Sequence, residues 1–225
     1  KFTRNEDWIK SADAVEIKIG QAAKPGLGGH LLKEKITTEI AKLRGIPEDE
    51  DQISPARNTD INSKQDLRDY VSQLKDITGG KPIGIKFAAG HVEGDLEYAL
   101  YAEPDFITID GRGGGTGAAP VFVKDNFAMP AVYAVARARK FLDKHQSQIS
   151  LVMTGGYRTS GEICKSIAMG ADAVAIATSA MIAVGCQQYR TCHTGNCPVG
   201  IATQKQNLRD RFSVDDSVAR FVNYT

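Results

Sequence analysis

The sequence predicts an α/β fold built on a parallel sheet. Five short apolar or β-branched runs show little alternation between apolar and polar residues, which is typical of strands covered on both faces. Segments with helix start and stop signals separate these runs, so strands and helices alternate along the chain. The predicted strands are 16–19, 82–88, 106–110, 150–154 and 173–178.

Local signals place helices between the predicted strands. Ser63 is suited to cap a helix, with Asp66 three residues later and Gly79 beyond its end. Pro130 is a suitable first residue for another helix, and Ser160 opens a further one. The predicted helices are 64–77, 94–102, 130–145 and 161–169.

Loop lengths help to distinguish the two common parallel architectures, the (β/α)8 barrel and the open sheet. Connections entering the strands are short, whereas those leaving them, such as 20–35 and 111–129, are long and rich in glycine. In (β/α)8 barrels the functional residues lie at the carboxyl ends of the strands, although open sheets bind ligands there too. We expect residues 1–225 to form a single domain. Because five strands cannot close a ring of eight, this domain would be the C-terminal five β/α units of an incomplete (β/α)8 TIM barrel, with the first three units upstream.

Composition argues against several classes of function. Of the 225 residues, 42% are hydrophobic, and 28 basic side chains nearly balance 27 acidic ones. A near-zero net charge without a basic run argues against binding to nucleic acid or to an anionic membrane. No apolar stretch approaches the roughly 18 residues of a membrane span. We therefore expect neither nucleic-acid nor membrane partners.

The N-terminus and the cysteines bear on localisation. The first residues, KFTRNEDWIK, contain neither an initiator methionine nor the apolar core of a signal peptide. We expect this end to be a cut in a longer protein, with ordinary processing or an excised tag as the alternative. Four cysteines without a targeting signal fit a reducing compartment, so a cytoplasmic location is expected.

A glycine-rich segment follows the third predicted strand. GGGTGA, residues 113–118, matches the G-x-G-x-x-G/A pattern of a dinucleotide-binding turn. That fold also needs a second strand and an acidic residue about twenty positions later, where this chain has an arginine-rich helix. We favour a flexible, close-packed loop over a ligand plane, because glycine lets the backbone approach a ligand.

Small residues end the last two predicted strands. Gly155 and Gly156 follow one strand, and Ala177 and Thr178 follow the next, before a new helix. Barrels commonly hold a phosphate between these loops, although a Gly-Gly pair alone is usually only a turn. Two such strand ends together favour a phosphate site, to which Arg158 would add charge.

Three cysteines fall within twelve residues of the segment 186–200, CQQYRTCHTGNCPVG. The spacing of Cys186, Cys192 and Cys197 lacks the paired arrangement typical of zinc sites, and His193 adjoins Cys192 too closely to complete one. Iron–sulfur clusters are held by thiolates on short irregular segments, and three ligands suit a cluster that lacks one iron. Unrelated free cysteines are the alternative.

The fourth cysteine lies outside this segment. Cys164 would complete a 4Fe–4S ligand set with the other three. Its place inside a predicted helix, beside the apolar Ile163, instead favours a buried structural thiol. We therefore leave Cys164 out of the predicted cluster site.

Five segments together resemble the FMN-binding synthase domain of glutamate synthases. They are KIGQAAKPGLGGHL, EIAKLRG, ISPARNTDI, GGGTGAAP and GCQQYRTCHTGNCPVGIATQ, within a resemblance that runs from about Glu16 to Phe212. The resemblance implies a barrel that binds FMN and a 3Fe–4S cluster, with the cluster passing electrons to the flavin. It implies reduction of 2-iminoglutarate, formed from 2-oxoglutarate and ammonia, to L-glutamate. In that case Cys186, Cys192 and Cys197 hold the cluster, in a cluster-binding loop at 186–200.

The resemblance also assigns substrate-binding residues. Gln21, Lys24 and Arg44 match family positions that bind the 2-oxo dicarboxylate. Two cations and an amide are suited to two carboxylates, which arginine binds through two parallel hydrogen bonds. A solvated surface pair is the alternative for Lys24 and Arg44. Lys24 precedes Pro25 and Gly26, which is an unusual place for a merely solvating lysine.

Cofactor roles follow from the same resemblance. Lys86 lies near the end of an apolar strand, where an unpaired ammonium group would be costly. The resemblance places it at the N1–C2=O edge of the flavin, where a cation stabilises the anionic reduced form. A buried ion pair with Asp110 is an equal alternative. The residues matching those that hold the FMN phosphate are Gly155, Gly156, Ala177 and Thr178.

Some positions depart from the family pattern. His30 stands where many members have Gln, Arg112 where His is common, and ISPARN replaces a run rich in Pro and His. MTGG replaces a strand end that usually bears Asp. The identity of the 2-oxo acid therefore stays open, and a related enzyme joining an amine to glutamate is an alternative. A non-catalytic, metal-binding remnant is another.

The same resemblance implies partners. The chain has no N-terminal catalytic cysteine of a glutaminase and is too short to include such a domain. Ammonia would come from a separate glutaminase domain or subunit, or from solution. The electron donor would be ferredoxin or an NADPH-linked subunit.

Overall fold

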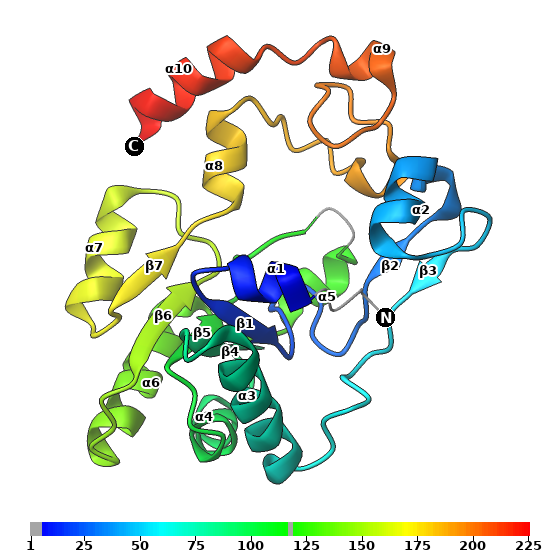
Figure 1. Cartoon of the computed structure of the whole chain (residues 1–225). Helices are drawn as coiled ribbons and strands as arrows, with labels where there is room; N and C mark the ends of the chain where they lie inside the picture. Colours follow the sequence, from blue (N-terminus) through cyan, green and yellow to red (C-terminus); the bar gives the residue numbers. More distant parts are fainter. Residues whose placement is uncertain (1–5, 117–118) are drawn as a thin grey trace.

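The structure is a computed structural model, which describes residues 6–116 and 119–225. Its centre is a sheet of five parallel strands in the order β1-β4-β5-β6-β7, which confirms the predicted α/β class (Figure 1). Gly117 and Ala118 of the GGGTGA pattern, and the first five residues of the chain, lie outside the described residues. The strands are β1 (Val15–Lys18), β4 (Ile83–Ala88), β5 (Phe106–Asp110), β6 (Ser150–Thr154) and β7 (Ala173–Ala175).

The register of the sheet sorts its side chains onto two faces. Lys18 is opposite Lys86, Lys86 is opposite Thr108, and Thr108 is opposite Val152. Side chains alternate between faces along each strand, so these four residues lie in one row across one face. The other face carries the fully buried residues of the strands, such as Ile85, Ile107 and Leu151.

Helices cover the apolar face of the sheet. Leu67 of α3, Leu96 of α4 and Leu142 of α6 are almost fully buried and join the strands in one core. Figure 1 shows α3, α4, α6 and α7 on the same side of the strands. The bounds of these helices are α3 Lys64–Thr78, α4 Val92–Tyr101, α6 Ala131–Lys144 and α7 Ser160–Ala168.

The helix ends follow the predicted signals with small differences. Ser63 and Asp66 form a complete capping box at the start of α3, and Gly79 ends this helix in the left-handed conformation. Pro130 is the N-cap of α6 rather than its first residue. Thr159, not Ser160, caps α7, because the Thr159 hydroxyl accepts the N–H of Glu162.

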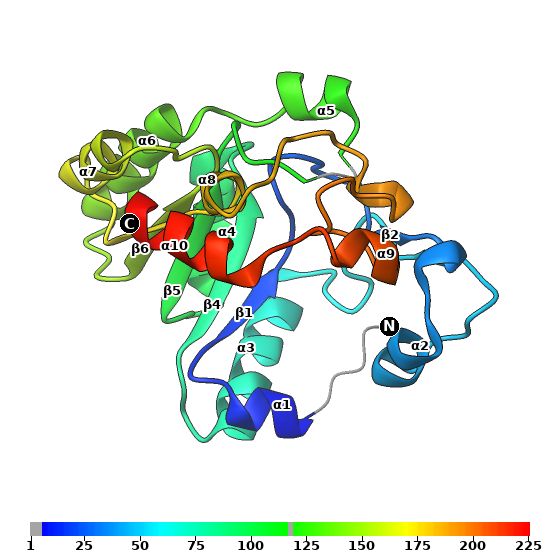
Figure 2. The same ribbon diagram turned by 90° about the horizontal axis from the view of Figure 1, so that it is seen from above.

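The sequence did not predict the smaller elements outside the sheet. A short antiparallel ribbon, a 3-10 turn and α2 lie to one side of the sheet, and α5 projects from the loop after β5 (Figure 2). These elements are too short to show a hydrophobic period. They are α1 Glu6–Ser11, β2 His30–Leu31, η1 Lys33–Lys35, α2 Thr38–Arg44, β3 Gln52–Ile53, α5 Val121–Asn126, η2 Cys192–Thr194 and α9 Gln206–Arg209.

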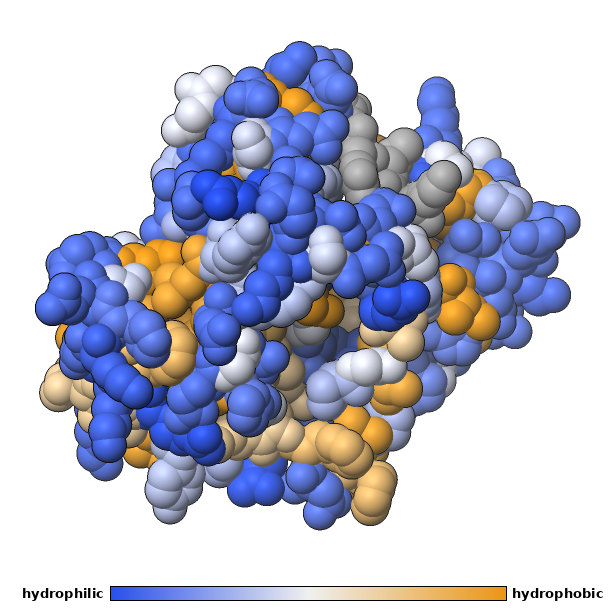
Figure 3. Space-filling model, turned by 90° about the horizontal axis from the view of Figure 1, so that it is seen from below, coloured by the Kyte–Doolittle hydropathy of each residue, from blue (hydrophilic) through white to orange (hydrophobic). Residues whose placement is uncertain are grey.

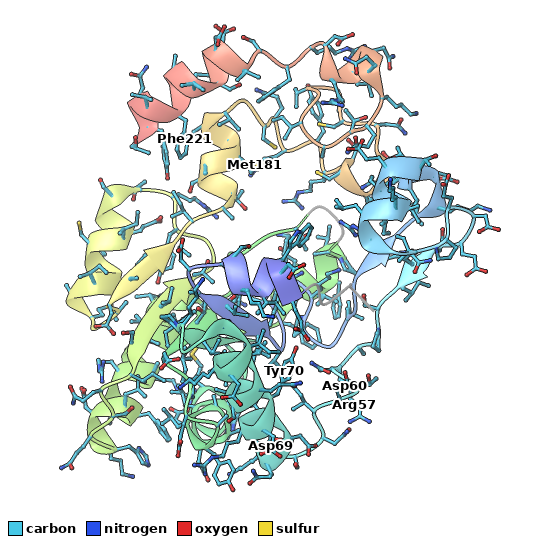
Figure 4. The ribbon with its side chains drawn as sticks, viewed as in Figure 1. Arg57, Asp60, Asp69, Tyr70, Met181 and Phe221 are labelled. Atoms are coloured by element: carbon cyan, nitrogen blue, oxygen red, sulfur yellow. The ribbon has the colours of Figure 1, made fainter. Side chains whose placement is uncertain are left out.

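The last part of the chain packs on α8 (Thr178–Ala183), the helix expected after the fifth strand. Within α10 (Val214–Tyr224), the Ser217 hydroxyl donates to the carbonyl of Val184, just after α8, at 3.1 Å. Phe221 extends from α10 toward α8, which carries Met181 (Figure 4). Apolar side chains elsewhere remain exposed, and Figure 3 shows them as separate patches among hydrophilic ones.

Two further expectations can be compared with the fold. Cys164 is exposed on α7, so the expected buried thiol is wrong: its position faces solvent instead of the sheet. In the described ranges 6–116 and 119–225, no helix is both long and apolar enough to cross a membrane.

Candidate functional site

Charged residues gather at the carboxyl ends of β1, β4 and β5. Lys18 and Lys86 are neighbours in the sheet register, and Asp110 ends the next strand. Lys24, from the loop after β1, lies close enough to affect the ionisation of Lys18. Parallel strands end at one edge of a sheet, so the topology alone brings Lys18, Lys86 and Asp110 together. We call Lys18, Lys24, Lys86 and Asp110 the strand-end cluster.

Asp110 joins the loop after β1 to the sheet. Its side chain is only 8% exposed, and its Oδ2 accepts the backbone N–H of Ala22 at 2.9 Å. Burial raises the pKa of Asp110 above its ordinary value, although the Ala22 N–H and the charges of Lys86 and Lys18 act in the opposite direction. The Ala22 contact holds the segment that carries Gln21 and Lys24 against the strand ends.

The lysines give this edge of the sheet a positive character. Partial burial and the neighbouring Lys86 lower the pKa of Lys18, while Asp110 and Glu16 act in the opposite direction. Lys18 also donates from Nζ to Oε1 of Gln21 at 2.6 Å. Three ammonium groups against two carboxylates leave an excess of positive charge that an anionic ligand would neutralise.

The structure brings two of the three predicted substrate residues to this cluster. Gln21 contacts Lys18, and half-buried Lys24 donates from Nζ to the carbonyl of Gly28 at 3.0 Å. Arg44 is the last residue of α2 and is exposed, in the group of small elements beside the sheet (Figure 1). The structure does not place Arg44 within the strand-end cluster, and its role stays a prediction.

The position of Lys86 is compatible with both roles predicted for it, the cation at the flavin edge and the ion-pair partner of Asp110. It is half-buried on β4, and its charge is among the influences that lower the pKa of Asp110. The Asp110 carboxylate meanwhile accepts its hydrogen bond from Ala22. The ammonium group of Lys86 therefore stays a candidate to bind a flavin edge.

Glycines bring the loop after β5 against the end of β6. Gly155 and Gly156 have φ values of 104° and 88°, in the region that side chains disfavour. A Cβ atom on Gly155 would lie 2.1 Å from the carbonyl oxygen of Gly111, and one on Gly156 would lie 2.8 Å from Cα of Gly113. Both positions therefore require glycine for close backbone packing.

The same glycine-rich loop reaches the start of α8. A Cβ atom on Gly115 would contact Oγ1 of Thr178 at 3.4 Å. Ala177 is the exposed N-cap of α8, and β7 ends at Ala175, so the predicted strand over 173–178 is too long. The loops after β5, β6 and β7 thus meet, and the predicted phosphate-binding positions lie among them.

One residue beside Thr178 was missed by the sequence analysis. Ser179 is 5% exposed, and its hydroxyl is the one buried side-chain polar atom without a hydrogen-bond partner among the described residues. Such a hydroxyl can form a hydrogen bond with a bound water, ion or other polar group. The sequence signal that could have identified Ser179 is its position directly after Thr178, a predicted phosphate-binding residue. Lys18 was also missed, although it is the first residue of the recognised segment KIGQAAKPGLGGHL.

The three cysteines lie on separate turns after α8. Cys186 follows the helix and bonds its N–H to the carbonyl of Met181, Cys192 begins η2, and Cys197 is buried beyond it. Among residues 6–116 and 119–225, no three His, Cys, Asp or Glu side chains are grouped as a metal site. The structure therefore does not gather the three thiols around one point.

The individual sulfur environments nevertheless suit thiolates. Burial raises the pKa of Cys197, but N–H groups of residues 199–202 outweigh this effect and leave the pKa below its ordinary value. Sγ of Cys186 accepts the N–H of Gln188 at 3.5 Å. Backbone hydrogen bonds to sulfur are a feature of iron–sulfur sites. The donor chemistry fits a cluster, whereas the spacing in this structure does not.

Comparison with known proteins identifies the family. The family model described as "Conserved region in glutamate synthase" matches residues 1–225. The chain belongs to the glutamate synthase family. It is 43% identical over 227 residues to the archaeal glutamate synthase [NADPH] of Methanocaldococcus jannaschii, covering 99% of this chain and 44% of that protein. It is also 43% identical to the archaeal-type glutamate synthase [NADPH] of Thermotoga maritima, covering 99% of this chain and 45% of that protein.

The chain therefore spans less than half the length of these two relatives of the glutamate synthase family. Among solved structures, it is similar to a flavocytochrome b2 mutant with benzoylformate, with a TM-score of 0.50, covering 97% of this chain and 45% of that one. At 14% identity the likeness concerns the fold alone. With the five parallel strands, it confirms the predicted partial (β/α)8 barrel.

Replacing Asp110 by Asn should change how stability depends on pH. The raised pKa means that ionising Asp110 costs more in the folded chain than in the unfolded chain, so stability falls as pH rises through the range between the two values. Asp110→Asn should therefore be more stable than the wild type at pH 7, and the difference should vanish at about pH 3, below the ordinary carboxyl pKa. Chemical unfolding of the intact protein at both pH values measures this.

Asp66→Asn is the matched control for Asp110→Asn. Backbone and side-chain donors of Asn62 and Ser63 lower the pKa of Asp66, so its ionised form stabilises the fold. Asp66→Asn should lose stability at pH 7 and approach the wild type as the pH falls. Equal pH dependence of Asp110→Asn and wild type would contradict the burial effect assigned to Asp110.

Proposed function

We propose that the intact protein is an iron–sulfur flavoenzyme of glutamate synthase type. It reduces 2-iminoglutarate, formed from 2-oxoglutarate and ammonia, to L-glutamate, with electrons relayed from a 3Fe–4S cluster to FMN. The strand-end cluster carries this proposal: excess positive charge beside glycine-lined loops suits an anionic substrate together with a phosphate-bearing cofactor. Family membership supports the assignment.

The phosphate of FMN would lie where the loops after β5, β6 and β7 meet. Gly155 and Gly156 let the backbone approach closely, and Ala177 and Thr178 add little bulk. The hydroxyl of Ser179 would gain a hydrogen-bond partner, which it lacks among the described residues 6–116 and 119–225. When bound, FMN supplies the hydride for the reduction. A positive Lys86 beside the ring edge would stabilise negative charge there.

The substrate's two carboxylates would be held by Gln21, Lys24 and Arg44. The Ala22–Asp110 hydrogen bond fixes the loop that carries the first two of these residues. Lys18 holds the amide oxygen of Gln21, which leaves the amide nitrogen free to donate to a carboxylate. Arg44 would have to approach from α2. The same residues would suit a related enzyme joining an amine to glutamate.

Cys186, Cys192 and Cys197 would hold the 3Fe–4S cluster. Hydrogen bonds to Cys186 and Cys197 support thiolate character, but binding requires the segment 186–200 to bring its three sulfurs closer together. Ammonia would come from a separate glutaminase domain or subunit. For the electron donor, an NADPH-linked subunit is favoured over ferredoxin, because the relatives are named glutamate synthase [NADPH].

Cofactor content of the intact protein tests the proposal. The purified protein should be yellow-brown, should release FMN on denaturation, and should contain iron and inorganic sulfide. Addition of 2-oxoglutarate and ammonia should reoxidise the reduced flavin. Absence of flavin would instead favour a non-catalytic metal-binding remnant. Flavin that these substrates fail to reoxidise would leave the cofactor assignment in place and remove the glutamate assignment.

Lys24→Met should weaken substrate binding. Loss of a hydrogen bond to a charged group costs about 1.5–3 kcal/mol, which corresponds to a roughly 10- to 100-fold rise in KM for 2-oxoglutarate. Steady-state kinetics of the intact enzyme measures the effect. Lys144→Met, on the exposed last turn of α6, is the control and should leave KM unchanged. Equal KM values for the two variants would exclude Lys24 from the substrate site.

Ser179→Ala should have opposite effects with and without FMN. In the flavin-free intact protein it removes a buried unsatisfied hydroxyl, so the free energy of unfolding should rise by about 1–3 kcal/mol. It should also weaken FMN binding, measured by titrating the flavin-free protein. Ser72→Ala, at an exposed position of α3, should change neither FMN affinity nor stability to this extent. Unchanged FMN affinity in Ser179→Ala would contradict the phosphate assignment.

A further inference from the structure

A hydrogen bond crosses one strand beneath the strand-end cluster. Oγ1 of Thr108, on β5, donates to Oε2 of Glu16, on β1, at 2.6 Å. In the sheet order β4 lies between these two strands, so the contact skips a strand. Thr108 is only 3% exposed, and this bond satisfies its buried hydroxyl.

Gly84 of β4 lies next to Glu16 in the sheet, between the two strands that this bond joins. In the register Glu16 is opposite Gly84, and Gly84 is opposite Phe106. A Cβ atom on Gly84 would lie 2.1–2.6 Å from ring atoms of Phe106, so the Phe106 ring covers this position. At the level of Gly84, β4 contributes no side chain between β1 and β5, and the Glu16 side chain crosses β4 to reach Thr108.

The contact lies directly below two lysines. One level further along the strands, Lys18, Lys86 and Thr108 are neighbours in the register. Paired residues of a parallel sheet point to the same face, so Glu16 and the two lysines share a face. β1 is an edge strand on which Glu16 is exposed, and the bond to Thr108 keeps its carboxylate turned inward.

We infer that Glu16, held by Thr108, is a positioning residue that sets the charge around Lys18 and Lys86. The inference rests on the proposed function, in which Lys86 binds the flavin edge. The charged groups that act on Lys18 are Lys86, Asp110, Lys24 and Glu16. Glu16 and Asp110 are the two anions among them, and Glu16 approaches from the side opposite the open strand ends.

Glu16→Gln tests the inference because it removes the charge while preserving size. With less negative charge near Lys86, the anionic reduced flavin should be more stable, so the flavin midpoint potential of the intact holoenzyme should rise. Thr108→Val releases the carboxylate and should shift the potential in the same direction, whereas Thr108→Ser keeps the hydroxyl and should not. Glu97→Gln, on exposed α4, is the charge control and should leave the potential unchanged.

A second measurement does not need the flavin. The pH dependence of Lys18 labelling, followed by competitive amine modification and mass spectrometry of the intact protein, reports its ionisation. Without the attraction of Glu16, the labelling midpoint of Lys18 should move to lower pH in Glu16→Gln. Thr108→Val should move it likewise, and decides the question if Glu16→Gln does not fold.

The outcomes separate the inference from the proposed function. A protein without flavin would overturn the proposed function, while the Lys18 midpoint still supports or overturns the role of Glu16 in setting charge. A flavin-containing protein whose potential and Lys18 midpoint are unchanged in both variants overturns the inference and leaves the proposed function in place. Shifts in Glu16→Gln and Thr108→Val, without shifts in Thr108→Ser and Glu97→Gln, support it.

Discussion

The hydrogen bond from the Ala22 N–H to the buried Asp110 carboxylate is the contact on which the site depends. It joins the loop after β1 to the end of β5 across 88 positions of sequence. Through it, Gln21 and Lys24 lie at the same sheet edge as Lys18 and Lys86. Burying a carboxylate is unfavourable, as the raised pKa of Asp110 indicates. The nearby lysines and the Ala22 N–H offset part of that cost. The arrangement that holds the loop after β1 therefore also gathers positive charge at the strand ends.

A second constraint is close backbone packing at glycine. Gly155 and Gly156 leave no room for side chains between the ends of β5 and β6. The predicted alternatives for this Gly-Gly pair, a simple turn or a phosphate site, are therefore not exclusive. The loop after β5, which this packing positions, also reaches Thr178, next to the Ser179 hydroxyl that has no hydrogen-bond partner among residues 6–116 and 119–225. Close packing against neighbouring backbone separates these two glycines from an ordinary surface turn.

The sheet was predictable because its signals are local and strong. Buried strands such as 106–110 and 150–154 are short runs rich in apolar and β-branched residues, and Ser63 with Asp66 marks a helix start whatever surrounds it. The site was only partly predictable. Gln21 and Lys24 were identified through a recognisable segment, but the place of Lys18 beside Lys86 and the burial of Ser179 depend on neighbours distant in sequence. Cys164 was misplaced because a short helix near apolar residues does not reveal which of its sides faces the sheet.

The face of the sheet opposite the helices links these observations. A closed barrel normally fills its interior with bulky apolar side chains. Here the corresponding rows hold Glu16, Lys18, Lys86, Thr108 and Asp110, and the outer strands β1 and β7 have one neighbour each. Such a face is costly to bury unless its charges find partners, and the Glu16–Thr108 bond supplies one beneath the lysines. The remaining positive charge lies toward the strand ends, beside the loops rich in glycine. Charged side chains in rows that a closed barrel would fill with bulky apolar residues are therefore better explained by ligand binding than by the stability of the fold.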